Sequence, residues 1–341
     1  MRGLLFQGDK RVKVAHFPDP TPEAGEVVVR IRAAAVCGSD MYTYRMSAER
    51  QLLKGLAGII PGHEPSGVVH AIGEGVRDLV IGDRVAVYHF RGCGHCQECR
   101  GGDLMWCADR RGYGGAIHGS DAELLITDAR NCLPLPDDAS HALGAMLMCV
   151  GGTAYQVMQK LDARVGQSIA VFGLGPVGLA GLLFAQAMGA DVIGIDLSPY
   201  RMELAQKLGA KRVIDAANED VPSAIRQWTG KEGVAASFES SGSPEAQATS
   251  VDVTTRGGRV AFVGFGSGIP SISPTSFIEK QLTLMGSFVF PIDAYERIVD
   301  FVQSQRVPLE SMVTHTVGLD DAPDVIAAFD RGETGKVIIA P

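Results

Sequence analysis

Hydrophobic positions in the first part of the chain form short runs rich in β-branched residues, separated by clusters of Gly, Pro and Asp. Such runs between turn-forming residues are typical of antiparallel strands. The pattern therefore predicts a mostly β domain from Arg11 to about Pro136. Its clearest strand candidates are residues 27–31, 67–72, 84–88 and 122–126.

The pattern changes near Ala142, and from Gln167 onward apolar strand-like runs alternate with helical patterns. Alternating strands and helices predict parallel βαβ units, and six strands suit a doubly wound sheet. The six candidates are residues 168–172, 191–195, 211–214, 235–239, 259–263 and 282–288.

After Pro291 the chain is expected to return to the first domain. The segments that would do so are an amphipathic stretch at residues 293–305, a helical signal at 321–330 and a terminal strand at 336–340. We therefore predict an α/β protein of two domains. Residues 1–150 and 291–341 form the first domain, and residues 151–290 form the second.

Composition narrows the possible partners. The 341 residues carry a formal net charge of −8, so no basic field attracts nucleic acid or anionic lipid. The apolar run at the N-terminus is too short for a secretory signal. Five glycines and a proline interrupt residues 169–190, the longest apolar stretch, which argues against a membrane span. The expected location is the cytoplasm.

A glycine motif follows the predicted strand at residues 168–172. Gly173, Gly175 and Gly178 form a G-x-G-x-x-G pattern, with Pro176 and Val177 between the last two. Between a strand and a helix, the first glycine permits a tight turn, the second lets the backbone approach a pyrophosphate, and the third lets helix and strand pack closely. We predict a dinucleotide site there; the alternative is a purely structural turn.

Asp196 ends the next predicted strand, 18 residues after Gly178. An acidic side chain there accepts hydrogen bonds from ribose hydroxyls and repels a 2′-phosphate, which favours NAD over NADP. Two alternatives stay open: Asp196 caps the helix that starts at Ser198, or Arg201 balances a phosphate. Val263 and Ser287, near the ends of later strands, are further candidates for cofactor contact.

Four cysteines lie within 15 residues and are interleaved with glycines: Cys93, Cys96, Cys99 and Cys107. Four thiolates complete the tetrahedral shell of zinc and leave no open position, so this site is expected to be structural. In a cytosolic enzyme, cysteines with such spacing are more often metal ligands than disulfides. An iron–sulfur cluster and chance packing of buried cysteines are the alternatives.

These motifs resemble those of the medium-chain dehydrogenase/reductase superfamily, in its zinc-containing alcohol dehydrogenase branch, over nearly the whole chain. The four-cysteine spacing matches the zinc lobe of that family, here about residues 91–108. Gly62-His63-Glu64 is similar to the family signature around a histidine of the catalytic zinc. Cys37-Gly38-Ser39-Asp40 resembles the segment with the first ligand, and residues 149–155, which begin with Cys149, resemble the segment with the last one.

The resemblance implies a Rossmann domain for NAD, a GroES-like catalytic domain and two zinc ions per chain. Cys37, His63 and Cys149 would form the Cys₂His set of a catalytic zinc, which keeps a position open for an alcohol oxygen. Ser39 would accept the alcohol proton. Glu64 would act as an occasional ligand, a neighbour of the ligands or a compensating charge, and Asp40 would orient His63 or serve as a turn residue.

Two positions depart from the family pattern. Tyr42 stands where some members have a histidine that ends the proton relay, so the relay stops at Ser39 and the ribose or uses Tyr42 or solvent. His89 stands where relatives place an aromatic wall of the substrate pocket. It would bond a second hydroxyl or a carboxylate of the substrate, or it is a satisfied strand side chain. Thr153 resembles a residue beside the nicotinamide, and a helix-turn threonine is the alternative.

Three classes of function compete. A zinc-free reductase would lack Cys37, His63 and Cys149 together, and a zinc-ribbon binding protein fused to a nucleotide-sensing domain would need a recognition helix near the cysteines. The sequence therefore favours a zinc-dependent enzyme that transfers hydride between an alcohol and NAD. Cys149 leans toward a plain primary or secondary alcohol, because polyol and threonine enzymes of the family carry an acidic residue there; His89 leans toward a polar one. A homodimer or homotetramer is expected, with residues 282–288 at the sheet edge.

Overall fold

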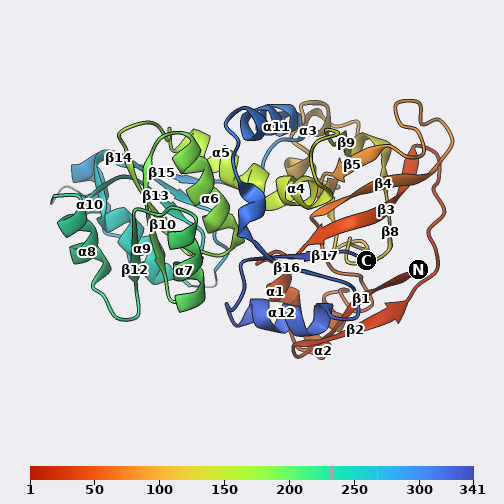
Figure 1. Ribbon diagram of the computed structural model, residues 1–341, viewed down its shortest axis with the longest axis horizontal. Coiled ribbons are helices and arrows are strands. Elements are labelled where there is room, and N and C mark those ends of the chain that lie inside the picture. Colours follow the sequence, from red (N-terminus) through yellow and green to blue (C-terminus); the bar gives the residue numbers. More distant parts are fainter. Residues whose placement is uncertain (231–232, 267) are drawn as a thin grey trace.

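The computed structural model describes residues 1–230, 233–266 and 268–341. An α/β half and a mostly β half lie side by side along the longest axis of the molecule (Figure 1). The α4 (His141–Met146), η3 (Leu147–Gly151) and α5 (Gly152–Lys160) helices lie between them.

The α/β half is built on a six-stranded, all-parallel sheet in the order β12-β11-β10-β13-β14-β15. This order confirms the predicted doubly wound fold. The strands before β13 are added on one side of β10 and the later strands on the other side. In such folds, ligands bind at the carboxyl ends of the strands near this change of order. The strands are β10 (Ser168–Phe172), β11 (Asp191–Asp196), β12 (Arg212–Asp215), β13 (Val234–Glu239), β14 (Thr254–Phe262) and β15 (Thr283–Gly286).

Helices cover this sheet because each βαβ crossover must bury an apolar helix face against it. The α6 helix is apolar almost all round and buries nine of its twelve residues. The helices of this half are α6 (Pro176–Ala187), α7 (Pro199–Lys207), α8 (Val221–Trp228), α9 (Pro244–Asp252) and α10 (Pro274–Lys280).

The β half contains a seven-stranded sheet in the order β16-β17-β3-β4-β5-β9, with β8 paired to β3. All its pairs are antiparallel except β16 with β17. β17 pairs with β3, so the C-terminal strand joins the sheet that starts near the N-terminus. The strands are β3 (Glu26–Ala35), β4 (Pro65–Ile72), β5 (Arg84–Val87), β8 (Leu124–Asp128), β9 (Cys132–Pro134), β16 (Val313–Val317) and β17 (Lys336–Ile339).

Three strands of five or more residues were absent from the sequence prediction. β1 (Arg2–Gly8) and β2 (Arg11–His16) form an antiparallel hairpin, and β1 buries Leu4 and Phe6. The apolar run at the N-terminus is too short for a secretory signal, but its length suits a strand. β16 has the sequence Val-Thr-His-Thr-Val, and it was not predicted because its three central positions are polar.

Shorter elements complete the β half. The lobe with the four cysteines contains β6 (Phe90–Arg91) paired with β7 (Arg111–Gly112), α3 (Gln97–Arg100) and η1 (Leu104–Trp106). The remaining elements are α1 (Asp40–Tyr44), α2 (Ala48–Leu53), α11 (Tyr295–Ser304), α12 (Ala322–Asp330), η2 (Ala129–Asn131), η4 (Ile292–Ala294) and η5 (Leu309–Met312). Among the described residues, no helix combines the length and the apolar character that a membrane crossing needs.

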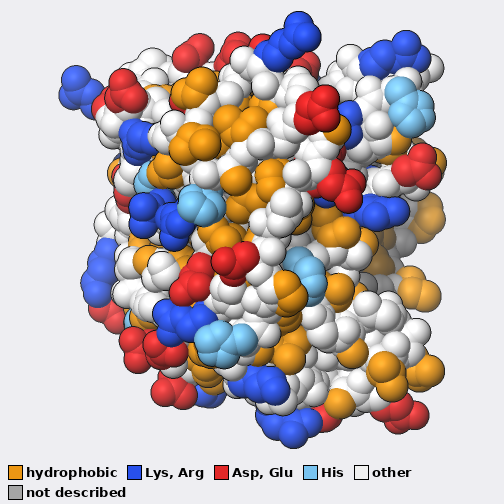
Figure 2. All heavy atoms as spheres, turned by 90° about the vertical axis from the view of Figure 1, so that its right-hand side faces the viewer, with side chains coloured by type: hydrophobic (Ala, Val, Ile, Leu, Met, Phe, Trp, Pro, Cys, Tyr) orange, Lys and Arg blue, Asp and Glu red, His pale blue; other side chains and the backbone are white. Residues whose placement is uncertain are grey.

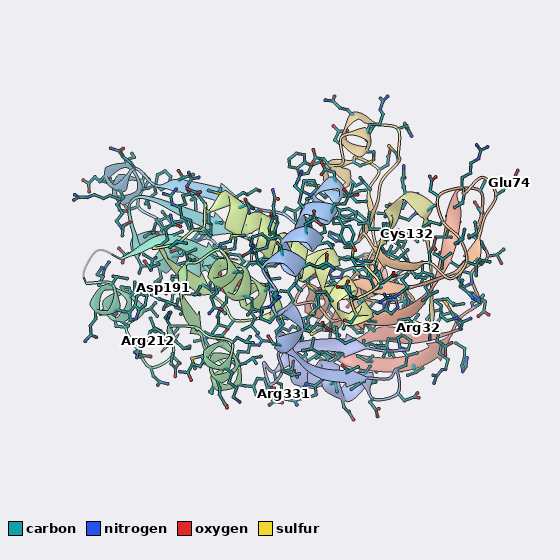
Figure 3. The ribbon with its side chains drawn as sticks, turned by 45° about the horizontal axis from the view of Figure 1, so that its top comes forward. Arg32, Glu74, Cys132, Asp191, Arg212 and Arg331 are labelled. Carbon is teal, nitrogen blue, oxygen red and sulfur yellow. The ribbon has the colours of Figure 1, made fainter. Side chains whose placement is uncertain are left out.

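The largest hydrophobic core runs through both halves, from Tyr88 of the β half to Val171 in β10. Cys132, the cysteine outside both metal-ligand groups, is buried within the β half (Figure 3), as the sequence suggested. At the end of the molecule formed by the β half, Lys and Arg side chains are interspersed with Asp and Glu (Figure 2).

Candidate active site

A cavity of about 1280 Å³ is lined by residues of both halves. Two of the sequence candidates, Asp40 and Glu64, are buried rather than part of the lining. The candidates that line the cavity are Cys37, Ser39, Tyr42, His63, His89, Cys149, Thr153, Gly173, Gly175, Pro176, Val177, Gly178, Asp196, Arg201, Val263 and Ser287.

Two neighbouring strands and one helical turn bring the expected ligands of the catalytic zinc together. Cys37 follows β3 and His63 precedes β4, and the pairing of Ala34 with Pro65 puts both at the same end of the sheet. Cys149 lies in η3, a π-helical turn, and such turns occur often at functional sites. The donor atoms of Cys37, His63, Glu64 and Cys149 all lie within 4.8 Å of one another.

This arrangement fits a zinc ion. The Sγ atoms of Cys37 and Cys149 are 4.0 Å apart, and a tetrahedron with Zn–S bonds of about 2.3 Å has edges of about 3.8 Å. The hydrogen bond with Cys149 holds the pKa of Cys37 well below its usual value, and the same contact raises the pKa of Cys149. A divalent cation between the two sulfurs would allow both to be thiolates.

Asp40 connects two of these ligands. One carboxylate oxygen accepts a hydrogen bond from the Cys37 amide at 2.8 Å, and the other lies 2.9 Å from His63 Nδ1. Asp40 thereby leaves His63 Nε2 free to face the thiols and fixes the ring plane. This is the carboxylate–histidine arrangement that commonly orients a zinc ligand.

Lys336 is a residue of the site that the sequence analysis missed. Its ammonium group lies 2.7 Å from Glu64 Oε2 and donates to the Val36 carbonyl at 2.8 Å, and both charged side chains are fully buried. Burial raises the pKa of Glu64, and the charge of Lys336 opposes that rise. Glu64 Oε1 has no hydrogen-bond partner in the described part of the chain. The sequence signal that could have identified Lys336 is a single lysine next to the apolar residues of β17.

Asp121 is a second buried carboxyl group that the sequence did not single out. A Cβ at Gly62, the residue before His63, would lie 2.1 Å from Asp121 Oδ1, and the backbone of Gly62 has φ of +89°. Burial raises the pKa of Asp121 to about 8. Glycine is thus needed at position 62 for both reasons, and the Gly-His-Glu motif rests on this packing.

The four lobe cysteines form a separate group. Their sulfurs also lie within 4.8 Å of one another, and Cys93 Sγ and Cys99 Sγ are 4.0 Å apart. Backbone amides point at the sulfurs: those of Cys96, Cys99 and Cys93 lie 3.4 Å from the Sγ atoms of Cys93, Cys96 and Cys107, respectively. Four sulfurs with this packing fit a closed zinc site.

The glycine motif has the geometry that a dinucleotide site needs. Gly173 follows β10 with φ of +85°, and the first residues of α6, which begins at Pro176, line the cavity. A Cβ at Gly178 would lie 1.8 Å from the Gly173 carbonyl oxygen, so the third glycine is required for close packing. The free amides at the start of α6 suit a pyrophosphate.

Asp196 is held between this motif and its own turn. Its carboxylate accepts hydrogen bonds from the amides of Leu174, Leu197 and Ser198 at 2.5 to 2.8 Å. The α7 helix is capped by the Ser198 side chain, so Asp196 is not the capping residue. Arg201 lies beside the motif, donates to the Phe329 carbonyl at 3.3 Å and has a buried Nε without a partner among the described residues.

His89 and Tyr42 occupy different parts of the cavity lining. Tyr42 is 61% exposed. His89 is buried, its Nδ1 bonds to the Met148 carbonyl, and burial lowers its pKa to about 3. Its Nε2 has no partner in the described ranges, so only half of the ring is satisfied. Thr153 Oγ1 is likewise buried and unpartnered there.

Two family models match the chain. The model described as alcohol dehydrogenase GroES-like domain matches residues 23–137, and the one described as zinc-binding dehydrogenase matches residues 176–304. The first covers most of the expected zinc ligands, and the second begins inside the glycine motif.

Relatives cover almost the full length. An L-threonine 3-dehydrogenase from Deinococcus deserti is 33% identical over 94% of this chain and 93% of its own. The solved alcohol dehydrogenase from Thermus sp. ATN1 is 30% identical, with a TM-score of 0.88 over 100% of this chain and 99% of that one. Galactitol-1-phosphate dehydrogenase from Escherichia coli is 26% identical, with a TM-score of 0.86 over 100% of both chains.

Proposed function

The chain belongs to the zinc-binding alcohol dehydrogenase branch of the medium-chain dehydrogenase/reductase superfamily, and we propose that it oxidises a small alcohol with NAD as the hydride acceptor. One observation carries the proposal. Cys37, His63 and Cys149 converge at a cavity that is also lined by the glycine motif. A metal-binding group and a dinucleotide site thus share one cavity.

The residues divide the work. Cys37, His63 and Cys149 would hold a zinc ion, which would supply Lewis-acid chemistry toward an alcohol oxygen, and NAD at the glycine motif would supply the hydride acceptor. The Oγ of Ser39 lies 3.5 Å from His63 Nε2, and Ser39 lines the cavity. We assign Ser39 the alcohol proton, which leaves through the ribose or solvent. Asp40 keeps His63 oriented throughout.

The geometry supports NAD rather than NADP. Asp196 places a carboxylate between the glycine motif and the cavity, and a 2′-phosphate would meet this negative charge. Three backbone amides already bond to Asp196, so its position is fixed before any cofactor binds. Arg201 packs beside it, where it can contact the ribose.

Metal content and turnover test the proposal together. The purified protein should contain about two zinc ions per chain, from one closed and one open site, and should reduce NAD with an alcohol. The Cys37→Ala variant should contain one zinc ion fewer per chain and should no longer turn over the alcohol. Cys132→Ala is the matched control, because Cys132 is a buried cysteine outside both groups. Full turnover in Cys37→Ala would refute the assignment of the catalytic ligands.

Two further proposals concern the setting of the enzyme. All seven cysteines, each within the described ranges, are free of disulfides, which suits the reducing cytoplasm. β15 lies at an open edge of the six-stranded sheet, and we propose that it pairs with a second copy in a homodimer or homotetramer.

A further inference from the structure

His89 is a rigid part of the cavity lining. It follows β5, is 2% exposed and stacks on Tyr88 with ring centres 4.7 Å apart. Phe90 and Phe290 contact the ring edge-on, with centres 4.5 and 6.1 Å away. Three aromatic neighbours leave the imidazole little freedom to turn, so the atoms that it presents are fixed by the fold.

The hydrogen bond at Nδ1 determines the tautomer of His89. Its partner is the backbone carbonyl of Met148, and a carbonyl oxygen can only accept. Nδ1 must therefore carry the proton. In a neutral ring Nε2 is then a bare acceptor, and this buried acceptor has no partner among the described residues. Leaving such a group unsatisfied is costly.

We propose that His89 Nε2 accepts a hydrogen bond from a second polar group of the substrate. The preferred substrates are then 1,2-diols or 1,2-amino alcohols, whose hydroxyl or ammonium group lies next to the reacting carbon. The inference rests on the proposed function, because it places the first oxygen beside His63. The ring centres of His63 and His89 are 6.2 Å apart, a span that a short substrate can bridge.

The proton on Nδ1 also distinguishes between the two substrate groups that the sequence left open for His89, a second hydroxyl and a carboxylate. A hydroxyl or an ammonium group brings a proton to Nε2. A carboxylate brings only lone pairs, so it meets an acceptor with an acceptor. The structure thus favours a donor-bearing alcohol at this position over a hydroxy acid that would use its carboxylate there.

A matched pair of substrates tests the inference. 2,3-Butanediol and 2-butanol differ in one hydroxyl group, and kcat/KM for NAD reduction should favour the diol by about 10- to 100-fold, since its loss leaves Nε2 unpaired. His89→Phe keeps an aromatic ring without an acceptor. In this variant the ratio of kcat/KM for the diol to that for 2-butanol should fall to about one, because turnover of the diol is lost. His70→Phe, at an exposed histidine, is the control and should keep the preference.

The outcomes separate the two proposals. Equal use of both alcohols, or an unchanged preference in His89→Phe, would overturn the role of His89 and leave the dehydrogenase assignment standing. If the zinc-loaded protein reduced NAD with neither alcohol nor with any other alcohol tested, both proposals would fail.

The tautomer is open to a direct measurement that needs no turnover. Nitrogen-15 NMR of protein labelled at histidine should show the His89 ring protonated at Nδ1, with His89→Phe identifying its signals. Addition of 2,3-butanediol should shift the Nε2 signal, and 2-butanol should shift it less. A proton on Nε2 in the free protein would refute the inference at its premise.

Discussion

At the scale of single residues, the least expected feature is the buried pair of Lys336 and Glu64 behind the expected zinc ligands. Removal of one partner leaves an uncompensated charge in the protein interior, which costs more than the pair itself contributes. The pair therefore acts as a constraint: neither side chain can be changed alone without loss of stability.

Lys336→Met should lower the free energy of unfolding by about 3–5 kcal/mol, because it strands the Glu64 carboxylate in the core. Urea denaturation followed by circular dichroism would measure the loss. The double variant Glu64→Gln with Lys336→Met removes both charges and should recover a large part of it. A single variant as stable as the unaltered protein would contradict the buried pair.

Asp196 gives a second prediction at this scale. Asp196→Asn removes the negative charge from the ribose side of the cavity but keeps the size of the side chain. The ratio of kcat/KM for NAD to that for NADP should drop about tenfold or more, which corresponds to about 1.4 kcal/mol of lost discrimination. Steady-state kinetics with each cofactor would give this ratio for the variant and for the unaltered protein. Equal losses with both cofactors would show that Asp196 only supports the glycine motif through its amide contacts.

At the scale of elements, α12 is tied to the rest of the β half through its last residue. Asp330 pairs with Lys10 at 2.9 Å and with Arg45, although only 5% of the Asp330 side chain is exposed. Burial alone would raise the pKa of Asp330, but hydrogen bonds from Lys10 and Arg45 hold it below its usual value. These three residues come from the β1–β2 turn, the end of α1 and the end of α12.

This pairing predicts a pH dependence of stability. A carboxyl group whose pKa is lower in the folded state stabilises fully above its unfolded pKa, about 3.9, and loses this contribution as the pH falls through the folded value. Asp330→Asn should therefore be less stable than the unaltered protein at pH 6, and the gap should narrow below about pH 4. Melting temperatures across this range would test it. A constant gap would exclude the ion pairs as its cause.

The sequence predicted elements where side-chain pattern decides structure and missed them where pairing decides it. β10 was predicted to the residue, because a strand buried on both faces reads as an uninterrupted apolar run. β16 and the π-helical turn η3 have no such pattern. β16 pairs in parallel with β17, and all five residues of η3 are buried. Lys336 was missed because its partner, Glu64, lies 272 positions away in sequence.

At the scale of the whole molecule, the two halves contribute different parts of one site. The ends of β3 and β4 carry Cys37 and His63, and the turn after β10 carries the glycine motif. Cys149 comes from the helical segment between the halves, which also shares their largest core. The site therefore exists only when both halves are packed together. The individual motifs can be found in the sequence alone, whereas their convergence was predicted only through the family resemblance.

The edge of the six-stranded sheet is the feature on which assembly should depend. The Ser287 amide donates to Phe262 of β14, and strand alternation then directs the backbone groups of Leu284 toward the open side. The Leu284 side chain is 37% exposed. An open parallel edge with an apolar side chain invites pairing with a second copy, and charged side chains are the usual protection against it.

Leu284→Lys should therefore separate the copies. The unaltered protein is expected to show two or four times the chain mass of 36.1 kDa by light scattering after gel filtration, and the variant should show half the mass of the parent assembly. Val165→Lys adds the same charge at a residue that is 82% exposed in the α/β half and should leave the mass unchanged. A lysine at the centre of a paired edge would leave its charge buried at the interface. If Leu284→Lys melted at the parent temperature and kept the parent mass, the copies would therefore have to meet at another surface.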